Sequence, residues 1–550
     1  MSIGHKAVRG AAWTILSSVG GRVIGVVATL VLTRYIAKAD YGDVSAVASA
    51  IVITVDELTR FGIFNYIVAK PASGAIAAWH CTVYHLGIGL PALAAVVVFR
   101  RQIVPFFGSK GAVKYIPGMA AVLAIERIAT GPERILARDL RFRTIAASSS
   151  AAQFLYAALG VVLAMQNFGG YAIVWGNIGQ WGVSFIWMAL AVKWSEWLKP
   201  HKLSMDLTKK IFAFGVPLAV GHAAGSFART WDNLLMARYF GSATAGQYAL
   251  AYNLADIPAT TVGEHIGDVL LPSFARMDDE ERGQALIRAS ALLALVMFPL
   301  AVGLGSVANA LTTAIFNEEW ASMWPMVAVL STLSVVRPIG WTVNSFLQVL
   351  NRPRTVMMLE ITKIGMLLLS IVVLQRFGPL WTCAAPGIAF GANAILSLWM
   401  ARSAANISMR KLTWGMIPPL FACVPMAAAV IGSHYLFMQI GWAGGPSKFL
   451  RVVVLIAEVG IGAIVFVPSA LVLAPTVSRE FLRLVKTAIL RRGGGGEDEE
   501  EGEEGEEGEG ERAEGEGDAP KAEAETDEPK ADDDAPKADD DDDKKEPDKS

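Results

Sequence analysis

Apolar runs of about 20 residues recur along almost the whole chain, and they constrain its fold more than any other feature. A run of this length crosses a lipid bilayer as one helix, in which every backbone polar group is paired internally. Hydrophobic residues make up 53% of the chain, as expected of an integral membrane protein. The sequence therefore predicts an all-α polytopic membrane protein with about 14 transmembrane helices. The expected spans are 11–33, 44–64, 79–99, 116–136, 145–165, 170–192, 211–235, 245–270, 289–315, 324–348, 357–375, 380–400, 415–437 and 450–473.

Lys and Arg are unevenly distributed over the loops between these spans. With the N-terminus in the cytoplasm, the cytoplasmic side receives twenty-five of them and the opposite side nine. Because basic residues accumulate on the cytoplasmic side, we expect both termini in the cytoplasm. One outer loop, RRQIVPFFGSKGAVK, departs from the trend with four basic residues.

One phrase occurs twice, as LTRYIAKADYG at residues 32–42 and as MARYFGSATAG at residues 236–246. At an offset of 204 residues its arginine, tyrosine and glycine coincide, and the pairs are Arg34 with Arg238, Tyr35 with Tyr239, and Gly42 with Gly246. The matched spans, first and seventh, are six helices apart and so enter the membrane in the same direction. This predicts two six-helix lobes related by a pseudo-twofold axis. We expect Arg and Tyr to anchor at the membrane interface and Gly to permit a turn.

The predicted domains are an N-lobe at 1–200, a C-lobe at 201–405, two further helices at 406–492, and a cytoplasmic tail at 493–550. The tail has 28 Asp and Glu against 7 Lys and Arg, whereas residues 1–492 have 41 Lys and Arg against 22 Asp and Glu. Its acidic low-complexity composition predicts disorder. Two roles remain open, a solvated appendage and a segment that binds the basic cytoplasmic loops or a basic partner.

Ionised side chains inside apolar spans are costly in lipid and usually face a cavity or a partner. They concentrate on the first, second, seventh and eighth spans, which predicts a polar cavity between the two lobes; structural salt bridges are the alternative. The set comprises Arg22, Asp56, Glu57, Arg60, Arg229, Asp232, Asp256, Glu264, His265 and Asp268. Six further charges are more scattered and carry no assigned role: Glu126, Arg127, Arg337, Glu360, Lys363 and Glu458.

Motifs for nucleotide hydrolysis and for catalysis are missing from the sequence. It contains no G-x-x-x-x-G-K-[ST], no H-E-x-x-H and no G-x-S-x-G. Cys81, Cys383 and Cys423 have no paired spacing, so neither a disulfide framework nor a zinc site is indicated. We therefore expect that the protein is not an enzyme and that it binds no metal, cofactor or nucleic acid. A proton or Na⁺ gradient, the membrane potential, or downhill consumption of the substrate would drive any transport.

Four segments carry a resemblance to a known family: RGAAWTILSSVGGRVIGVVATLVLTRYIAKADYG, PERILARDLRFRTIA, FGGYAIVWGNIG and RTWDNLLMARYFGSATAGQYALAYNLADIP. They resemble the polysaccharide transporters, or lipid-linked oligosaccharide flippases, of the multidrug/oligosaccharidyl-lipid/polysaccharide exporter superfamily. The resemblance covers the first eight spans. It implies a bacterial inner-membrane flippase that moves undecaprenyl-diphosphate-linked glycan from the cytoplasmic to the periplasmic leaflet by alternating access. It also implies the bilayer and the glycan lipid as partners, with a polysaccharide polymerase or export machinery as candidate protein partners.

Roles for the cavity residues follow from their chemistry. Arg22, Arg60 and Arg229 are expected to hold the diphosphate, because guanidinium groups match phosphate oxygens and stay charged. The acids are expected to bind a coupling proton or Na⁺, or to line the sugar path; they are Asp56, Glu57, Asp232, Asp256, Glu264 and Asp268.

Three alternative functions remain open. A cation-coupled drug or metabolite antiporter of the same superfamily requires cavity acids but no arginines. Lipid II is a second possible cargo for a flippase. A polytopic glycan ligase or polymerase is disfavoured, because its outer loops are generally larger than those of this chain.

Overall fold

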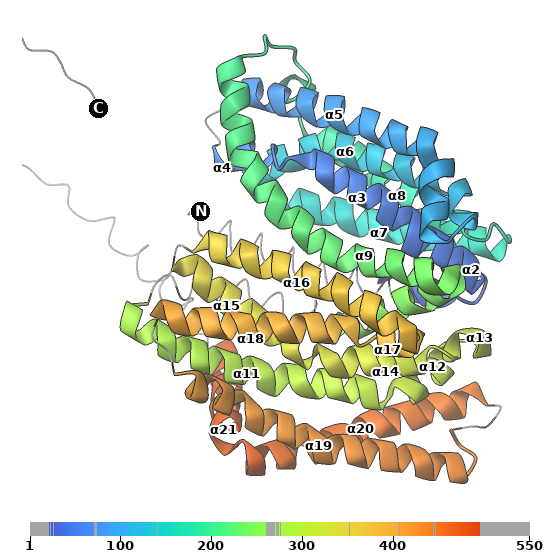
Figure 1. Ribbon diagram of the computed structural model, residues 1–550, viewed down its shortest axis with the longest axis vertical. Helices are drawn as coiled ribbons and strands as arrows, with labels where there is room; N and C mark the ends of the chain where they lie inside the picture. The colour runs from blue at the N-terminus through green and yellow to red at the C-terminus, as the bar shows by residue number, and fades with distance from the viewer. Residues whose placement is uncertain are drawn as a thin grey trace, which may run out of the picture. The chain divides into compact units, whose positions relative to one another are not determined.

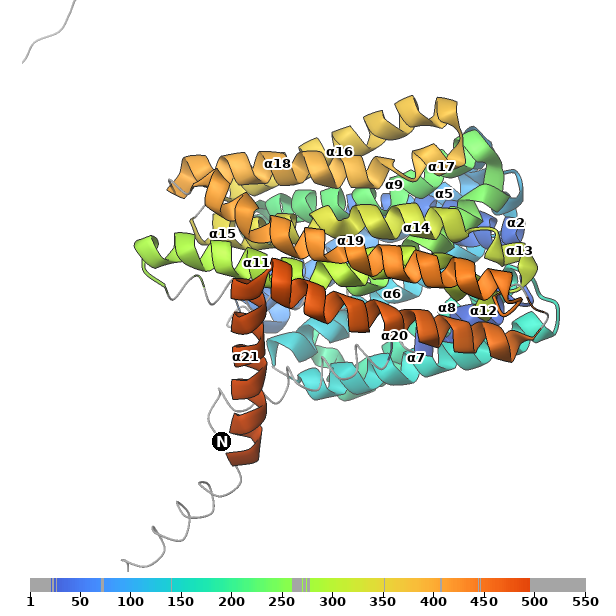
Figure 2. The same cartoon turned by 90° about the horizontal axis from the view of Figure 1, so that it is seen from below.

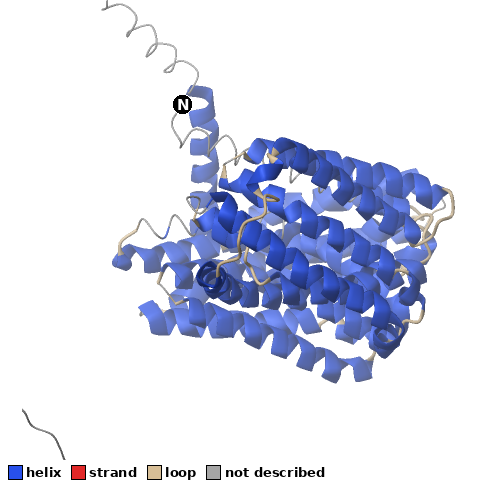
Figure 3. Cartoon of the chain, turned by 90° about the horizontal axis from the view of Figure 1, so that it is seen from above, coloured by secondary structure: helices blue, strands red, loops and turns tan. Residues whose placement is uncertain are grey.

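The computed structural model describes residues 21, 24–25, 27–70, 74–139, 141–259, 270, 274, 277–350, 352–405, 408–443, 445 and 447–494. Regular structure in these residues is helical throughout, and no strand occurs among them (Figure 3). The chain divides into two compact units, Met1–Leu484 and Val485–Ser550. Apart from the helical residues 485–494, the features described below lie in the first unit. The predicted tail at 493–550 falls outside the described residues except for its first two.

The N-terminal half is built from long helices joined by short turns. One continuous helical run begins with α2 and passes through η1 into α3, where two left-handed residues, Phe61 (φ 49°) and Gly62 (φ 58°), end it. The elements are α2 (Lys38–Tyr41), η1 (Gly42–Ala48), α3 (Ser49–Arg60), α4 (Asn65–Ala69), α5 (Gly74–Ile103), η3 (Val104–Phe107), η4 (Gly111–Lys114), α6 (Ile116–Arg138), α7 (Phe142–Met165), α8 (Tyr171–Ala191), η5 (Trp194–Glu196) and α9 (Met205–Pro258).

The C-terminal half continues in the same style. A 3-10 turn, η7, separates α14 from α15, and a proline in the first turn of α15 suits a helix start. The elements are α11 (Asp279–Ser306), α12 (Ala308–Ile315), α13 (Glu318–Ala321), α14 (Trp324–Leu333), η7 (Ser334–Val336), α15 (Arg337–Val349), α16 (Pro353–Leu374), η8 (Gln375–Phe377), α17 (Pro379–Thr382), α18 (Ala385–Ala405), α19 (Met409–Gln439), α20 (Lys448–Leu473) and α21 (Pro475–Gly494).

Eight helical segments of the described chain are long and apolar enough to cross a membrane. They are 74–107, 142–165, 281–306, 324–349, 354–377, 379–403, 410–439 and 448–473, and each coincides with a predicted span. The other predicted spans are more polar or lie partly outside the described residues. In α6, for example, four charged residues between Glu126 and Arg134 lower the hydropathy. The chain is therefore a multi-pass membrane protein.

The long helices pack in two sets within the first unit. Helices α3 and α5 to α8 contact one another, and so do α11, α14 to α16, and α18 to α20. The segment α9 consists of two helices that meet at Gly241, whose non-helical angles (φ 82°, ψ 168°) interrupt it. It contacts members of both sets, α2, η1 and α3 in the first and α14 and α16 in the second (Figure 1). Figure 2 shows α19 and α20 running alongside each other on the outside of α11. The two sets of helices are therefore connected through α9.

The two copies of the repeated phrase lie against each other. A Cβ atom on Gly42 would stand 1.8 Å from the carbonyl oxygen of Ser242 and 2.9 Å from the amide nitrogen of Gly246. Reciprocally, a Cβ atom on Gly246 would stand 2.5 Å from the carbonyl oxygen of Lys38 and 2.9 Å from the nitrogen of Gly42. Because Gly42 has helical angles (φ −65°, ψ −43°), the prediction that it permits a turn is wrong. Its role is close approach of two backbones.

Further contacts close this end of the helix bundle. The ring of Tyr41 meets the buried ring of Trp320 edge-on, with centroids 5.3 Å apart. Ser322 accepts hydrogen bonds from Lys38 (3.3 Å) and from Gln247 (2.8 Å). These contacts tie the first copy of the phrase to α9 and to the turn that follows α13.

The outer loop with the exceptional positive charge has partners at the same end. Lys114 Nζ lies 3.1 Å from Asp40 Oδ1, and the Tyr115 hydroxyl donates to the same oxygen (2.7 Å). The guanidinium of Arg238 lies over the ring of Phe106, 5.0 Å from its centroid. Part of the unexpected charge in this loop is therefore neutralised by an acid from the repeated phrase.

Candidate functional site

A large polar cavity lies between the two sets of helices. Its volume is about 860 Å³, large enough for a sizeable polar ligand. The lining residues come from α3, α4, α5, α6, α9, α15 and α16 and from the turn after α3. They are Glu57, Arg60, Gly62, Ile63, Phe64, Asn65, His85, Thr130, Arg134, Ala219, Gly225, Ser226, Asn344, Gln348 and Glu360, and we call this space the main cavity.

Arg60 faces the main cavity from the last position of α3. Its Nε donates to Asp56 Oδ2 (2.5 Å) and its Nη2 donates to Glu126 Oε1 (2.5 Å). The left-handed turn at Phe61 and Gly62 ends the helix directly after it. Two carboxylates thus fix the guanidinium, and 28% of its side chain stays exposed.

A second arginine behind this wall supports it. Arg127 is buried, with its Nε 2.5 Å from Asp56 Oδ1 and its Nη1 3.0 Å from the His85 carbonyl oxygen. Its Nη2 donates to the carbonyl oxygen of Asp56 and to the hydroxyl of Thr59. A Cβ atom on Gly89 would overlap the Arg127 guanidinium, so only glycine leaves room for it. Arg127 therefore compensates the charge of Asp56 and orients it toward Arg60.

Arg134 adds a second positive charge to the cavity wall. It lies two helical turns along α6 from Arg127 and lines the main cavity. Within the described residues no carboxylate forms an ion pair with it, in contrast to Arg60. Arg134 is therefore available to an anionic ligand.

A smaller space adjoins the main cavity on the side of α15, α16 and α18. Its volume is about 190 Å³, and Gly225, Asn344 and Glu360 line both spaces. We call it the side chamber; it is lined by Gly225, Ala228, Tyr252, Asp256, Arg337, Gly340, Trp341, Asn344, Glu360, Lys363, Phe390 and Asn393.

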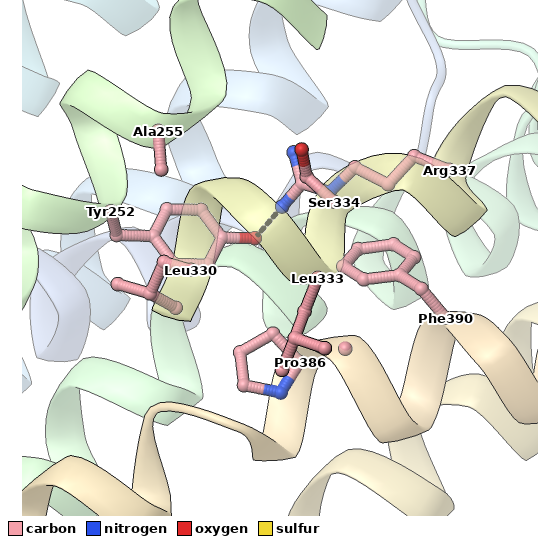
Figure 4. Close-up of a pocket in the computed structure, with 9 residues that line it drawn as sticks. Tyr252, Ala255, Leu330, Leu333, Ser334, Arg337, Pro386 and Phe390 are labelled. Carbon is pink, nitrogen blue, oxygen red and sulfur yellow. Dashed lines mark hydrogen bonds between the residues drawn. The ribbon is translucent and has the colours of Figure 1, made fainter. Parts of the chain in front are cut away.

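The two described cations of the side chamber have acidic partners. Arg337 pairs with Asp256 and donates to the Tyr252 hydroxyl (2.6 Å), as Figure 4 shows for the tyrosine. Lys363 pairs with Glu360 on the same helix. Arg337 lies at the break between α14 and α15. Interrupted membrane helices of this kind often form the walls of transport sites.

The structure brings some of the predicted site residues together and not others. Arg60 and Glu57 line the main cavity, Asp256 lines the side chamber, and Asp56 lies behind Arg60. Asp232 lines neither space: it is fully buried and accepts a hydrogen bond from the Tyr248 hydroxyl (2.9 Å). Arg22, Glu264, His265 and Asp268, and the side chain of Arg229, lie outside the described residues.

Several of the charges that sequence reasoning left without a role belong to this site. Glu126, Arg127, Arg337, Glu360 and Lys363 line the two spaces or support their walls. Glu458 does not, because it is buried between α19 and α20 and pairs with His434 (2.8 Å). The 204-residue offset contains a signal for one of them, because it carries Arg134 to position 338, next to Arg337.

Metal ligation finds no support in the described part of the chain, where no group of three or more His, Cys, Asp or Glu side chains could hold an ion. The three cysteines are buried and unpaired. The arrangement of charged and polar side chains is suited to holding a polar or anionic molecule.

Solved structures show the fold. The chain superposes on the lipid II flippase MurJ in an inward closed conformation with a TM-score of 0.65 at 14% identity, over 83% of this chain and 98% of that one. An inward-facing multidrug resistance MATE family transporter of the MOP superfamily superposes with a TM-score of 0.53 at 15% identity, over 74% and 95%. The chain therefore has the fold of these transporters.

Sequence relatives point to one family. The lipopolysaccharide biosynthesis protein WzxC of Escherichia coli (strain K12) is 25% identical over 77% of this chain and 87% of its own length. The succinoglycan biosynthesis transport protein ExoT of Rhizobium meliloti (strain 1021) is 25% identical over 59% of this chain and 65% of its own length. A family described as polysaccharide biosynthesis protein matches residues 31–325. Since this match covers more than half of the sequence, the chain belongs to that family of polysaccharide biosynthesis proteins.

Proposed function

We propose that this protein is a flippase that moves a polyprenyl-diphosphate-linked oligosaccharide from the cytoplasmic to the periplasmic leaflet of a bacterial inner membrane. The observation that carries the proposal is the main cavity, which lies between two sets of helices and presents Arg60 and Arg134. A diphosphate needs cations held in a partly dry site, and guanidinium groups provide them with matching geometry. The names of the relatives WzxC and ExoT, and the fold shared with MurJ, agree with this cargo.

Alternating access of two lobes is the mechanism that we propose. About fourteen helices would form two six-helix lobes at 1–200 and 201–405 with two helices added at 406–492. The reciprocal contact of Gly42 and Gly246 supports a pseudo-twofold relation, because symmetric interfaces place equivalent residues against each other. This contact would seal the periplasmic end while the main cavity receives cargo from the cytoplasmic end.

The diphosphate would bind in the main cavity. Arg60 is held by two acids, so its orientation is set before the ligand arrives, which lowers the cost of binding. Arg134 has no acidic partner among the described residues and would gain one in the phosphate. Arg22 and Arg229, which lie outside the described residues, remain part of this proposal.

A coupling proton or Na⁺ would act through carboxylates that form no ion pair with a described residue. Asp56 and Asp256 are each already paired with arginine. Glu57 lines the main cavity, and Asp232 is buried with a tyrosine hydroxyl as its side-chain partner. We therefore assign the coupling role to Glu57 or Asp232 in preference to Asp56 and Asp256. Glu264 and Asp268 are further candidates.

Replacing Arg60 or Arg134 with glutamine should lower polysaccharide export about tenfold or more. The reason is the loss of a charge-assisted hydrogen bond to phosphate, worth about 1.5–3 kcal/mol, and about 1.4 kcal/mol corresponds to a factor of ten. The measurement is polysaccharide output of a deletion strain complemented at matched protein levels. Arg101→Gln, at an exposed position, is the control. Normal export by both cavity variants would refute the diphosphate assignment.

A further inference from the structure

The side chamber contains an amide without a partner. Asn393 on α18 is only 4% exposed, yet its side chain makes no hydrogen bond with any described residue, and its Oδ1 is fully enclosed. Buried polar groups in native proteins are paired in the great majority of cases, and an exception calls for an explanation. Asn393 also lines the chamber wall. Rotation of the side chain would bring this amide oxygen into the chamber, where a ligand hydroxyl group would pair with it.

Two neighbouring side chains are incompletely paired as well. Asn344 donates to Glu360 (3.4 Å), but its Oδ1 is enclosed and has no partner. Arg337 uses its two terminal nitrogens for Asp256 and Tyr252, while its Nε is enclosed and unpaired. The chamber thus offers donors and acceptors together, in a space that α9, α15, α16 and α18 enclose.

Aromatic rings form the rest of the wall. Phe390 packs under the guanidinium of Arg337, whose central carbon lies 4.5 Å from the centroid of the Phe390 ring. Trp341 lines the chamber one helical turn further along α15. Figure 4 shows the ring of Phe390 beside Arg337, with the Tyr252 hydroxyl on the other side of the guanidinium. Apolar ring faces together with a few placed amides and charges suit a ligand with both C–H and O–H surfaces. A pyranose ring has both.

The charges of the chamber distinguish it from the diphosphate site. Its two described cations, Arg337 and Lys363, each already have a carboxylate partner, and Phe390 covers both. An entering phosphate would have to displace these acids. A hydroxylated ring would only need to replace hydrogen bonds, so the chamber favours a sugar over a phosphate.

We propose that the side chamber binds one monosaccharide unit of the lipid-linked glycan, a step that rests on the proposed flippase function. Gly225, Asn344 and Glu360 border both spaces, so a diphosphate at Arg60 and Arg134 and a sugar in the chamber belong to one continuous path. Asn393, Asn344 and Arg337 bind ring hydroxyls, and Trp341 packs on the ring face. The chamber thereby makes the flippase selective for a glycan-bearing lipid over the bare carrier.

The test compares two lipids on the purified full-length protein. The probes are undecaprenyl diphosphate and the lipid-linked glycan that accumulates in cells lacking the protein. The wild type should bind the glycan lipid about tenfold more tightly, and Asn393→Leu and Trp341→Leu should each remove most of this preference while leaving undecaprenyl diphosphate binding unchanged. Matched controls are Asn177→Leu on α8 and Trp399→Leu on the exposed side of α18.

Thermal stability supplies a second readout. Asn393→Leu should raise or preserve the melting temperature of the ligand-free protein, because leucine fills the space without leaving an unpaired amide. If Asn393 had a purely structural role, the substitution would instead lower the melting temperature of the protein. Equal binding of both lipids by the wild type, or equal loss of both in the chamber variants, would overturn the sugar site while leaving the flippase proposal intact. Failure of the wild type to bind either lipid would count against the flippase proposal itself.

Discussion

Alanine at Gly42 should stop polysaccharide export and lower the melting temperature of the purified protein. The added Cβ would stand 1.8 Å from the carbonyl oxygen of Ser242, and this neighbour is backbone, so no change of rotamer relieves the overlap. The two helices would have to separate at the contact between the copies of the repeated phrase. Overpacking of this kind costs roughly 1–3 kcal/mol of stability. Separation of α2 and η1 from α9 would also open the contact that we propose closes the periplasmic end, and this would impair transport further.

Gly246→Ala should reproduce this result, because the contact is reciprocal: its Cβ would stand 2.5 Å from the carbonyl oxygen of Lys38. Gly87→Ala on α5 is the matched control, since no heavy atom lies within 4 Å of its Cβ position. Export and melting temperature at wild-type values in Gly42→Ala would show that the two copies do not pack closely.

Removing Arg127 should have the second large effect, on folding rather than on binding. Arg127→Met leaves Asp56 without one of its two cations in a buried site, and loss of one partner from a buried pair costs about 3–5 kcal/mol. We expect little protein in the membrane and a strongly lowered melting temperature. Fluorescence-detected size exclusion and thermal unfolding in detergent measure both quantities.

A companion substitution tests the cause of this loss. Asp56→Asn combined with Arg127→Met removes the uncompensated charge, so the double variant should recover part of the stability lost in the single one. Arg60→Gln should be milder, because its side chain is partly exposed and Asp56 keeps Arg127 as a partner. Wild-type stability of Arg127→Met would contradict the role assigned to this arginine.

The multi-pass helical character of the fold could be predicted from the apolar runs, whereas the count of about 14 spans and the two six-helix lobes remain predictions. Run length identifies eight helices as spans because lipid demands internal backbone pairing over a fixed thickness. The contact between the two segments related by the offset of 204 residues was not predicted, and the turn assigned to Gly42 was wrong. A sequence pattern does not show whether a helical glycine serves a turn or a close contact, since both need the absence of a Cβ atom.

The candidate site was predicted only in part. Arg60 and Asp256 were found because charges in apolar helices are rare and informative. Arg127, Arg337 and Lys363 carry the same signal, but their spacing along the sequence is irregular. Which of them meet depends on how α6, α15 and α16 are placed against one another in space, and the sequence does not determine this placement. Asn393 carries no charge, so only its burial without a partner marks it.

The side of the membrane on which complete lipid-linked glycan accumulates tests the proposed function most directly. In spheroplasts of a deletion strain, an impermeant glycan-labelling reagent should leave the accumulated lipid unlabelled. Restoring the wild-type protein should make it accessible, and Arg60→Gln should not. Complete glycan lipid that is already labelled on the outer face of the deletion strain would contradict a flippase and would point to a later step, polymerisation or ligation.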